Sequence, residues 1–363
     1  MFEIIFLVVV SVYFIQTIIF SIGANKKFNK LKENELPFAT IIVAARNEEE
    51  NILECMKSLN NSIYPEGKLE IIIVDDHSED NTGKIIDEFI QDKPIFKKVI
   101  PHKQIGEVKG KANAIANAIE LAKGEVILTT DADCTVSPSW AKTIASYYTK
   151  DVAIVCGYTN QTADGMFTGM QDMDFIYLLT VAGGTMNLGK PLSAIGNNMS
   201  YSKKAYDEVG GYAAIPFSVT EDFKLLMAIY NLKKYKLIYP LDKDALVTSK
   251  PCETPQKLYW QKKRWGVGGL DSDFTGFFVM ITAWLSHFCI LLAPFYFSVN
   301  VLLIMLFKIL TDYFFLWSVY KKLNLKIKLT HFIAFEIYFV LYVLVLPVLV
   351  VFSRNIKWKG RKF

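Results

Sequence analysis

Residues 126–133 read VILTTDAD, an apolar run that ends in two aspartates one residue apart. A second run, LEIIIVDD at 69–76, ends in the same way with Asp75 and Asp76. Apolar runs of this length are typical of strands that are covered on both faces of a sheet. Carboxylates that end such strands lie at the carboxyl edge of the sheet, where open α/β folds bind ligands. Both runs therefore predict an α/β fold with an acidic ligand site.

The segments around these two runs alternate between strand and helix patterns. Apolar strands alternating with helices indicate a mostly parallel sheet with helices on both faces. Ser78 is expected to cap one of the helices. Strands are expected at 39–45, 69–74, 98–100, 126–130 and 152–156, and helices at 48–59, 78–90, 111–122 and 139–148.

Two common nucleotide-binding motifs are missing from this α/β region. The segment GEVKGKA at 106–112 has a glycine–lysine pair, but it lacks the spacing and the Ser/Thr of a P-loop. No G-x-G-x-x-G follows the first strand, which disfavours a dinucleotide site. The strand-end carboxylates instead favour Mg²⁺ or Mn²⁺ holding a diphosphate, because these ions take one or two carboxylates together with phosphate oxygens.

Composition separates the chain into an ordinary middle and two apolar ends. The 363 residues are 52% hydrophobic and 14% aromatic, and the excess lies before about residue 25 and after about residue 273. A net charge of +4 without a basic stripe argues against a nucleic-acid partner. The five cysteines show no paired spacing, which indicates reduced thiols. Cys134, directly after the acidic pair, is either reactive or a packing residue, and packing is favoured.

Four apolar segments are long enough to cross a membrane. Residues 2–22 are followed, not preceded, by positive charge, which predicts a retained anchor. The positive-inside rule places the N-terminus outside and the middle domain in the cytoplasm. Lys308, Asp312 and Glu336 lie inside the later segments, and charged residues within a membrane segment are candidates for a functional role. Oppositely charged residues one helical turn apart can instead neutralise each other, and this structural explanation is favoured here. These later segments are 274–297, 299–320 and 331–352.

The side of the C-terminal tail is ambiguous. Lysines at 321, 322, 326 and 328 belong inside, so a third crossing would place the basic residues from Arg354 to Lys362 outside. Either one C-terminal segment lies along the interface or the tail is an exception, and a cytoplasmic tail is favoured. We therefore expect an anchor at 1–24, a cytoplasmic domain at 25–273 that ends in an interfacial helix, and a membrane region at 274–363 with two to three passes and a basic tail.

Six short motifs follow one another between residues 38 and 270. They are VAARNEE at 43–49, VDDHS at 74–78, KGKAN at 109–113, DAD at 131–133, TED at 220–222 and QKKRW at 261–265. With all six in this order, the chain resembles the membrane-bound members of glycosyltransferase family 2. The resemblance implies a GT-A fold, which is Rossmann-like with a mostly parallel sheet, and a metal-dependent transfer of a hexosyl unit from a sugar nucleotide, expected to be UDP-linked.

The resemblance also implies a role for each matching position. Asp222 is the expected general base, and Asp131 and Asp133 are the expected metal ligands for Mg²⁺ or Mn²⁺. The donor nucleotide would contact Arg46, Glu48, Asp75, Asp76, Lys111 and Asp131, and the diphosphate or acceptor would contact Gln261, Arg264, Trp265, Glu221 and Asn197. A carboxylate that deprotonates the acceptor hydroxyl opposite the leaving diphosphate gives inversion at the anomeric carbon.

Several of these residues also have plain structural explanations. Glu221 and Asp222 could simply begin a helix, because acidic residues favour a first turn. Trp265 could belong to an aromatic belt with its neighbours Tyr259 and Trp260. The pair at 197–198 could form a turn. The presence of the other motifs favours the catalytic interpretation for Asp222.

Two acceptors remain open, together with a third function. QKKRW at 261–265 is typical of processive β-linked polysaccharide synthases, but few membrane segments are available to enclose a polymer channel. The tail WKGRKF at 358–363 is similar to that of lipid- and carotenoid-modifying relatives. A lipid or other membrane-associated hydroxyl is favoured, poly-N-acetylglucosamine-like synthesis is the alternative, and a non-catalytic membrane binding or transport protein is the least favoured. The expected location is the cell membrane, as a multi-pass protein.

Overall fold

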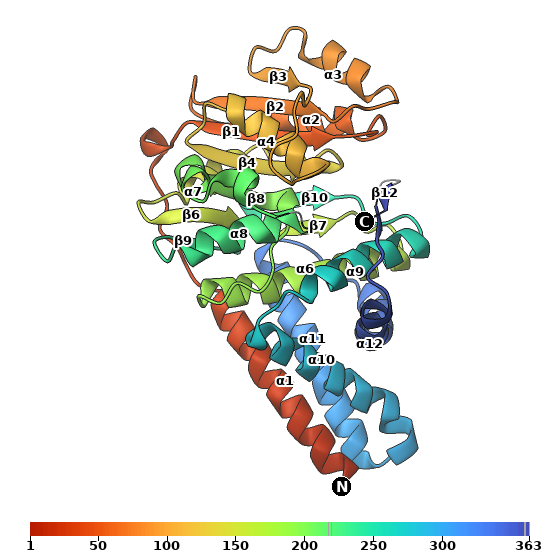
Figure 1. The fold of residues 1–363 in the computed structure, drawn as a ribbon. Coiled ribbons are helices and arrows are strands. Elements are labelled where there is room, and N and C mark those ends of the chain that lie inside the picture. The colour runs from red at the N-terminus through yellow and green to blue at the C-terminus, as the bar shows by residue number, and fades with distance from the viewer. Residues whose placement is uncertain (217, 219, 359–360, 363) are drawn as a thin grey trace. The chain divides into compact units, whose positions relative to one another are not determined.

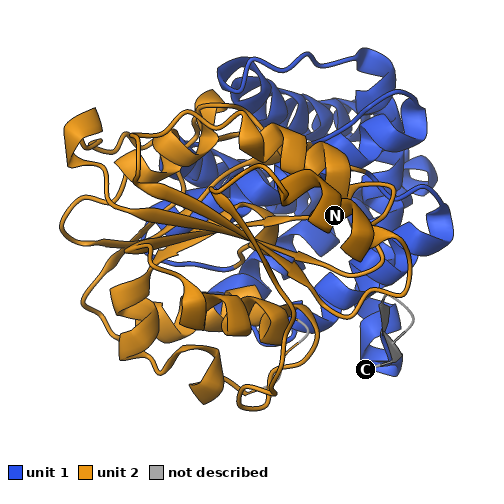
Figure 2. Cartoon of the chain, turned by 90° about the horizontal axis from the view of Figure 1, so that it is seen from above, with its two compact units in different colours: residues 1–25, 161–192, 251–363 blue, residues 26–160, 193–250 orange. Residues whose placement is uncertain are grey.

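The computed structural model describes residues 1–216, 218, 220–358 and 361–362. The chain divides into two compact units (Figure 2). The sheet unit consists of residues 26–160 and 193–250, and the helical unit consists of residues 1–25, 161–192 and 251–363. The tail sequence at 358–363 lies partly outside the described residues, so its resemblance to lipid-modifying relatives stays a prediction.

A seven-stranded mixed sheet forms the centre of the sheet unit, in the order β3-β2-β1-β4-β8-β6-β9. The first four strands in this order are parallel: β3 (Phe96–Val99), β2 (Leu69–Asp75), β1 (Ala39–Ala45) and β4 (Val126–Asp131). β8 (Met199–Ser202) runs antiparallel to β4 and to β6 (Val152–Cys156), and β9 (Lys236–Ile238) is parallel to β6. The expected mostly parallel α/β sheet is confirmed.

The strand register brings the two predicted acidic ends together. Ala45 of β1 pairs with Asp75 of β2, and Ala44 pairs with Asp131 of β4. Both aspartates therefore end at the same edge of the sheet, on either side of β1. The arrangement follows from apolar strands that pair in parallel, because their carboxyl ends then coincide.

Helices cover both faces of the sheet (Figure 2). They are α2 (Ile52–Asn60), α3 (Thr82–Ile90), α4 (Lys111–Leu121), α5 (Trp140–Ser146), α7 (Lys203–Glu208) and α8 (Glu221–Asn231). A smaller sheet contains β5 (Cys134–Val136), β10 (Val247–Ser249) and β7 (Thr159–Gln161). Trp140 is almost fully buried beneath the main sheet, and its indole N–H donates a 3.0 Å hydrogen bond to Asn198 Oδ1.

Two helix starts differ from the sequence prediction. α2 begins at Ile52 instead of residue 48, and α3 begins at Thr82 instead of Ser78. Ser78 does not cap α3; its hydroxyl accepts a 3.1 Å hydrogen bond from the backbone N–H of Asn47. The polar residues before α2 and α3 form hydrogen bonds between the two loops that precede these helices. Because they are used in this way, they do not form the first turn of either helix.

Six helices make up most of the helical unit (Figure 1). They are α1 (Phe2–Ala24), α6 (Met166–Asn187), α9 (Pro255–Gly269), α10 (Phe274–Leu292), α11 (Val299–Lys322) and α12 (Leu329–Phe352). Four of them, α1, α10 with its extension to Tyr296, α11 and α12, are long and apolar enough to cross a membrane. The described part of the tail forms β11 (Lys357–Trp358) and β12 (Arg361–Lys362).

The charged side chains of the apolar helices pair with one another. Lys308 Nζ lies 2.6 Å from Asp312 Oδ2 and 3.2 Å from Glu336 Oε2. Tyr13 of α1 donates a 2.6 Å hydrogen bond to Asp312. His287 Nε2 lies 3.0 Å from Lys308 Nζ. These contacts connect α1, α10, α11 and α12, and they support the interpretation that the charges neutralise one another.

Candidate active site

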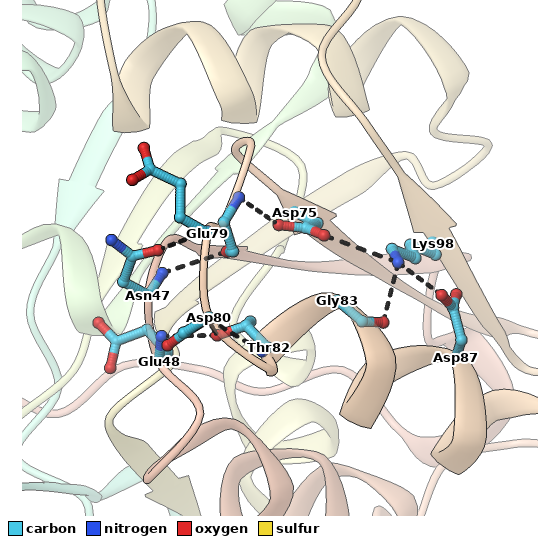
Figure 3. A network of polar contacts seen from close by, with 10 residues as sticks. Asn47, Glu48, Asp75, Glu79, Asp80, Thr82, Gly83, Asp87 and Lys98 are labelled. Carbon is cyan, nitrogen blue, oxygen red and sulfur yellow. Dashed lines mark hydrogen bonds and ion pairs between the residues drawn. The ribbon is translucent and has the colours of Figure 1, made fainter.

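Two loops at the carboxyl edge of the sheet are bound tightly to each other (Figure 3). They follow β1 and β2, at residues 46–51 and 76–81. Asn47 Oδ1 accepts a 2.9 Å hydrogen bond from the backbone N–H of Glu79, and the N–H of Glu48 donates one of 2.7 Å to Thr82 Oγ1. Asn47 and His77 both have positive φ, of 52° and 55°. This left-handed backbone is costly outside glycine, and the loop–loop hydrogen bonds stabilise it.

Asp75 and Asp76 have different surroundings. Asp75 Oδ1 accepts a 3.0 Å hydrogen bond from the Ser78 backbone N–H, and its Oδ2 lies 3.6 Å from Lys98 Nζ. Both partners come from the sheet unit itself, so the Asp75 carboxylate has a structural task (Figure 3). The main chain of Asp76 bonds to the end of β1: its N–H donates to the Ala45 carbonyl, and its own carbonyl accepts a 3.1 Å hydrogen bond from the Arg46 side chain.

Lys111 lies among three of the predicted carboxylates. It begins α4 and forms an ion pair with Asp131 at the end of β4. Burial alone would lower the pKa of Lys111, but the charges of Asp131, Glu221 and Asp222 raise it above its ordinary value. The TED and DAD motifs are far apart in the sequence, and the fold brings them to one lysine.

Gly196 lies beside the Asp222 carboxylate. A Cβ at Gly196 would be 3.1 Å from Asp222 Oδ2 and 3.4 Å from Lys111 Nζ. The Gly196 carbonyl accepts a 2.9 Å hydrogen bond from Thr129 Oγ1 on β4, the strand that carries Asp131. Asp222 therefore lies near the end of β4. Glu221 and Asp222 also begin α8, so the helix-start explanation and the site explanation both apply.

Two buried thiols lie beside Asp131 and Asp133: Cys55 Sγ is 3.6 Å from the Asp131 carbonyl oxygen, and Cys134 Sγ is 3.5 Å from Asp133 Oδ1. Burial raises the pKa of the Cys134 thiol well above its ordinary value, and Asp133 and Asp131 raise it further. The pKa of Cys55 is raised by burial first and then by Asp133, Asp131 and Glu48. Both thiols are therefore protonated at neutral pH, which supports the packing interpretation of Cys134 over a reactive one.

Asn197 and Asn198 form a buried turn, η2 (Gly196–Asn198). Asn197 Oδ1 accepts a 3.0 Å hydrogen bond from Thr159. The Asn198 amide donates to the carbonyls of Tyr158 and Ala245 at 2.7 and 2.9 Å. The turn is thus present, and Asn198 is used to join η2 to the surrounding strands and loops. An acceptor contact for Asn197 stays a prediction.

The QKKRW motif lies on α9 in the helical unit. Trp265 stacks on Phe175 of α6, with ring centroids 5.6 Å apart, and Lys262 Nζ lies 4.3 Å from the Trp265 ring centroid. Lys262 is buried and pairs with the fully buried Asp174. Gln261 and Arg264 are half-buried on the same helix. The helix therefore uses Lys262 and Trp265 to pack against α6.

Sequence reasoning missed three of these features. Lys98 as the partner of Asp75 and Gly196 as the neighbour of Asp222 depend on tertiary contacts between distant segments. Asp174 lies inside α6, a helix that was not predicted. An aspartate within a run of apolar and small residues, such as DMDFIYLL at 172–179, was the available signal for a buried partner.

The fold and this carboxylate edge define a GT-A domain, and comparison with known proteins agrees. The solved structure of the mannosyltransferase PcManGT from Pyrobaculum calidifontis, in complex with GDP-Man and Mn²⁺, superposes with a TM-score of 0.64. It is 15% identical, with 96% of this chain and 99% of that chain covered. The model of glycosyl transferase family 2 matches residues 40–222, which is half of the chain. The chain belongs to glycosyl transferase family 2.

Curated relatives match about two thirds of the chain. The probable glycosyltransferase YdaM of Bacillus subtilis is 29% identical over 67% of this chain and 58% of its own length. The beta-monoglucosyldiacylglycerol synthase of Trichormus variabilis is 28% identical, over 67% of this chain and 51% of its own. The poly-beta-1,6-N-acetyl-D-glucosamine synthase of Staphylococcus epidermidis is 26% identical, over 68% and 59%. The chain thus spans 51% to 59% of the length of these relatives.

Proposed function

We propose that the protein is an inverting glycosyltransferase that moves a hexosyl unit from a sugar nucleotide to a membrane lipid. The observation that carries this proposal is the convergence of Asp131, Lys111 and Asp222 at the end of β4. A cation beside a carboxylate suits a departing diphosphate, and a second carboxylate nearby suits the removal of a proton. A purely binding or transport protein would have no need for this combination.

The donor would bind along the edge between β2 and β4. Asp75 or Asp76 would contact the nucleoside, helped by Arg46 and Glu48, and Ser78 and Lys98 hold the Asp75 carboxylate at this edge. Lys111 would bind the diphosphate, since its ammonium group lies near Asp131 at the end of β4 and near Asp222 at the start of α8. A UDP-linked sugar is the expected donor.

The donor set of Asp131 and Asp133 fits Mg²⁺ or Mn²⁺. Such ions bind to one or two protein carboxylates and take their remaining ligands from phosphate oxygens and water. Among the residues that the structure describes, no group of three or more His, Cys, Asp and Glu side chains forms a closed metal cage. An ion here would supply positive charge to the leaving diphosphate when bound.

Asp222 would act on the acceptor. Its carboxylate would take the proton of the acceptor hydroxyl as the oxygen forms its bond to the anomeric carbon and the bond to the diphosphate breaks. One displacement inverts the configuration, so an α-linked donor gives a β-linked product. Glu221, in the same helix turn, and Asn197 would border the acceptor, and Gln261, Arg264 and Trp265 of α9 would contribute contacts to diphosphate or acceptor.

A lipid acceptor has two supports. The helical unit offers four helices apolar enough to cross a membrane. One group of relatives is named for monoglucosyldiacylglycerol synthesis. The alternative is a processive β-linked polysaccharide synthase, which the QKKRW motif and the poly-N-acetylglucosamine synthase relatives favour. In either case, the sheet unit would face the cytoplasm of a multi-pass membrane protein.

Product partition tests the proposal. Purified full-length protein in lipid nanodiscs would receive Mn²⁺, a membrane lipid extract and, in separate reactions, radiolabelled UDP- or GDP-sugars. We expect label from one donor to enter the organic phase as a glycolipid of low mass. Label in a water-soluble product of high mass would support the processive alternative, and transfer from no donor would contradict the enzyme proposal.

A further inference from the structure

The path of α12 bears on which apolar helices cross the membrane. In Figure 1, α12 is viewed along its axis, whereas α1 and α11 are viewed from the side. α12 crosses α11 near its middle, through the ion pair of Glu336 with Lys308 and a ring contact of Phe332 with Tyr313 at 5.3 Å. A crossing helix that follows α11 after a short connection would be expected to pack alongside it along most of its length.

The two halves of α12 instead pack against α6 and α9. The middle of α12 also contacts α10, where the indole N–H of Trp284 donates a 3.4 Å hydrogen bond to the carbonyl of Leu344. Near its start, His331 fills the space beside Gly169 of α6, where a Cβ would lie only 2.1 Å from the imidazole ring. Phe335 and Phe339, one helical turn apart on α12, both contact Tyr177 of α6. Their ring centroids lie 5.9 and 4.9 Å from the Tyr177 ring centroid. The first half of α12 therefore follows α6.

The second half of α12 follows α9. The ring of Tyr342 lies 5.1 Å from Lys262 Nζ. Leu346 and Val350 pack so closely against Gly266 that a Cβ there would be 3.0 and 2.9 Å away. Just past the helix end, Ser353 Oγ accepts a 3.1 Å hydrogen bond from Lys263.

These contacts determine the side on which α12 ends. α6 and α9 both belong to the stretch between α1 and α10, so they lie on one side of the membrane when those two helices cross it. The start of α12 contacts α6, and its end contacts α9. We propose that α12 does not cross the membrane but lies within the leaflet beneath α6 and α9, with its outer face against lipid acyl chains.

The outer face has the chemistry that acyl chains require. A row of branched aliphatic side chains recurs along it at intervals of three to four residues: Ile333, Ile337, Leu341, Val345 and Val348, each 49% to 62% exposed. Pro347 is also exposed, as are residues 329–330 and 351–352 at the two helix ends. Exposure of such a continuous apolar row to water is unfavourable, so we expect an apolar environment to cover it.

The charges at the two ends of α12 agree with this placement. Lys326 and Lys328 precede the helix, and Arg354 follows it. Basic residues collect on the cytoplasmic side of a membrane. The basic residues at both ends of α12 can lie on the cytoplasmic side only when the helix starts and ends on the same side of the membrane. The ambiguity of the tail is then removed: α1, α10 and α11 cross, and the tail lies on the side of residues 323–328.

Cysteine labelling tests the topology. Single cysteines would replace Phe297, Lys326 or Asn355 in a chain whose native cysteines are changed to serine or alanine, and sealed, right-side-out cells would be treated with a membrane-impermeant maleimide. We expect Phe297→Cys to react in intact cells, and Lys326→Cys and Asn355→Cys to react only after permeabilisation. Reaction of Asn355→Cys together with Phe297→Cys in intact cells would overturn the proposal.

Depth measurement tests the lipid contact independently. Ile333→Cys, Leu341→Cys and Val348→Cys, each carrying a fluorophore, would be placed in nanodiscs with lipids that bear a quencher at a shallow or a deep acyl position. A helix within one leaflet predicts strong quenching and the same depth for all three sites. A steady progression of depth through the bilayer centre would show a crossing helix, and absence of quenching would show that protein covers this face. Either result contradicts the proposal.

A thermal unfolding profile in detergent that matches the wild type would show that each variant is folded.

Discussion

The carboxylates at the edge of the main sheet and the charges of the apolar helices show two uses of the same residue types. At the sheet edge, Asp131 and Asp222 meet at Lys111, which lies at the start of a helix beside a ligand edge. In the helical unit, Lys308 and Asp312 are both fully buried and pair with each other. We propose that the charges gathered at Lys111 serve the reaction, whereas the charges within the apolar helices hold these helices together. Changes in the first group should alter activity, and changes in the second should alter stability.

Asp222→Asn should have the largest effect. Removing a general base lowers the rate by roughly 10²- to 10⁴-fold. The substitution keeps the shape beside Gly196, so donor affinity and thermal stability should remain near wild type. Initial rates of sugar transfer, with donor binding by calorimetry, check this. Glu221→Gln is the matched control and should lose far less activity. Equal rates for Asp222→Asn and wild type would remove Asp222 from the mechanism.

Lys308→Met should destabilise the helical unit. Breaking a buried ion pair by removing one partner typically costs about 3–5 kcal/mol, because the remaining charge is left buried. Asp312 and Glu336 would lose their common cation. We expect a lower unfolding temperature in detergent, with unchanged donor affinity in the molecules that remain folded. Lys326→Met, at an exposed position, is the control. Unchanged stability of Lys308→Met would contradict the structural role of the pair.

Asp172 should make stability depend on pH. Burial raises its pKa to about 6, against hydrogen bonds from Tyr320 and Gln161 that lower it. The folded protein therefore retains a proton that the unfolded chain loses, and this contribution to stability falls as pH rises from about 3.8 to about 6. Each pKa unit corresponds to about 1.4 kcal/mol, so the total is about 2–3 kcal/mol.

Asp172→Asn provides the comparison for this pH dependence. The free energy of unfolding of the variant relative to wild type should increase across the same pH range and level off above it. Denaturant titrations at a series of pH values measure the difference. A difference that does not vary with pH would show that Asp172 has an ordinary pKa in the folded protein.

Asp75→Asn and Asp76→Asn sharpen the comparison within one motif. Hydrogen bonds to charged groups contribute about 1.5–3 kcal/mol, so loss of the Asp75 carboxylate, which binds Ser78 and Lys98, should lower stability by roughly the smaller of these values. Asp76→Asn should raise the KM for the donor. Melting curves and donor titrations of both variants distinguish the two roles. The opposite pattern would exchange them.

The sequence predicted the sheet edge well for a physical reason. Apolar strands that end in aspartate are local patterns, and parallel pairing alone brings Asp75 and Asp131 to the same edge. The approach of Asp222 to Lys111 depends on η2 and α8, whose positions come from long-range packing. Only the resemblance to a family connected these motifs in advance.

The helical unit was less predictable for the same reason. Hydropathy identified four apolar helices, but it does not separate a crossing helix from one that lies beneath α6 and α9. Likewise, the apolar surroundings of Asp174 in the sequence signalled a buried partner, but they did not identify that partner as Lys262 of the QKKRW motif. The predicted starts of α2 and α3 lie four residues before the observed ones. The residues in between are of types that helices accept, but in the structure they form hydrogen bonds from one loop to the other.

The anomeric configuration of the product tests the central claim most directly. The claim is that one sheet edge carries both the diphosphate-binding groups and the base, so that transfer occurs in a single displacement. Proton NMR of the purified product from an α-linked glucosyl or N-acetylglucosaminyl donor gives the configuration at the new linkage. We expect a β-linked product. An α-linked product would contradict single displacement assisted by Asp222.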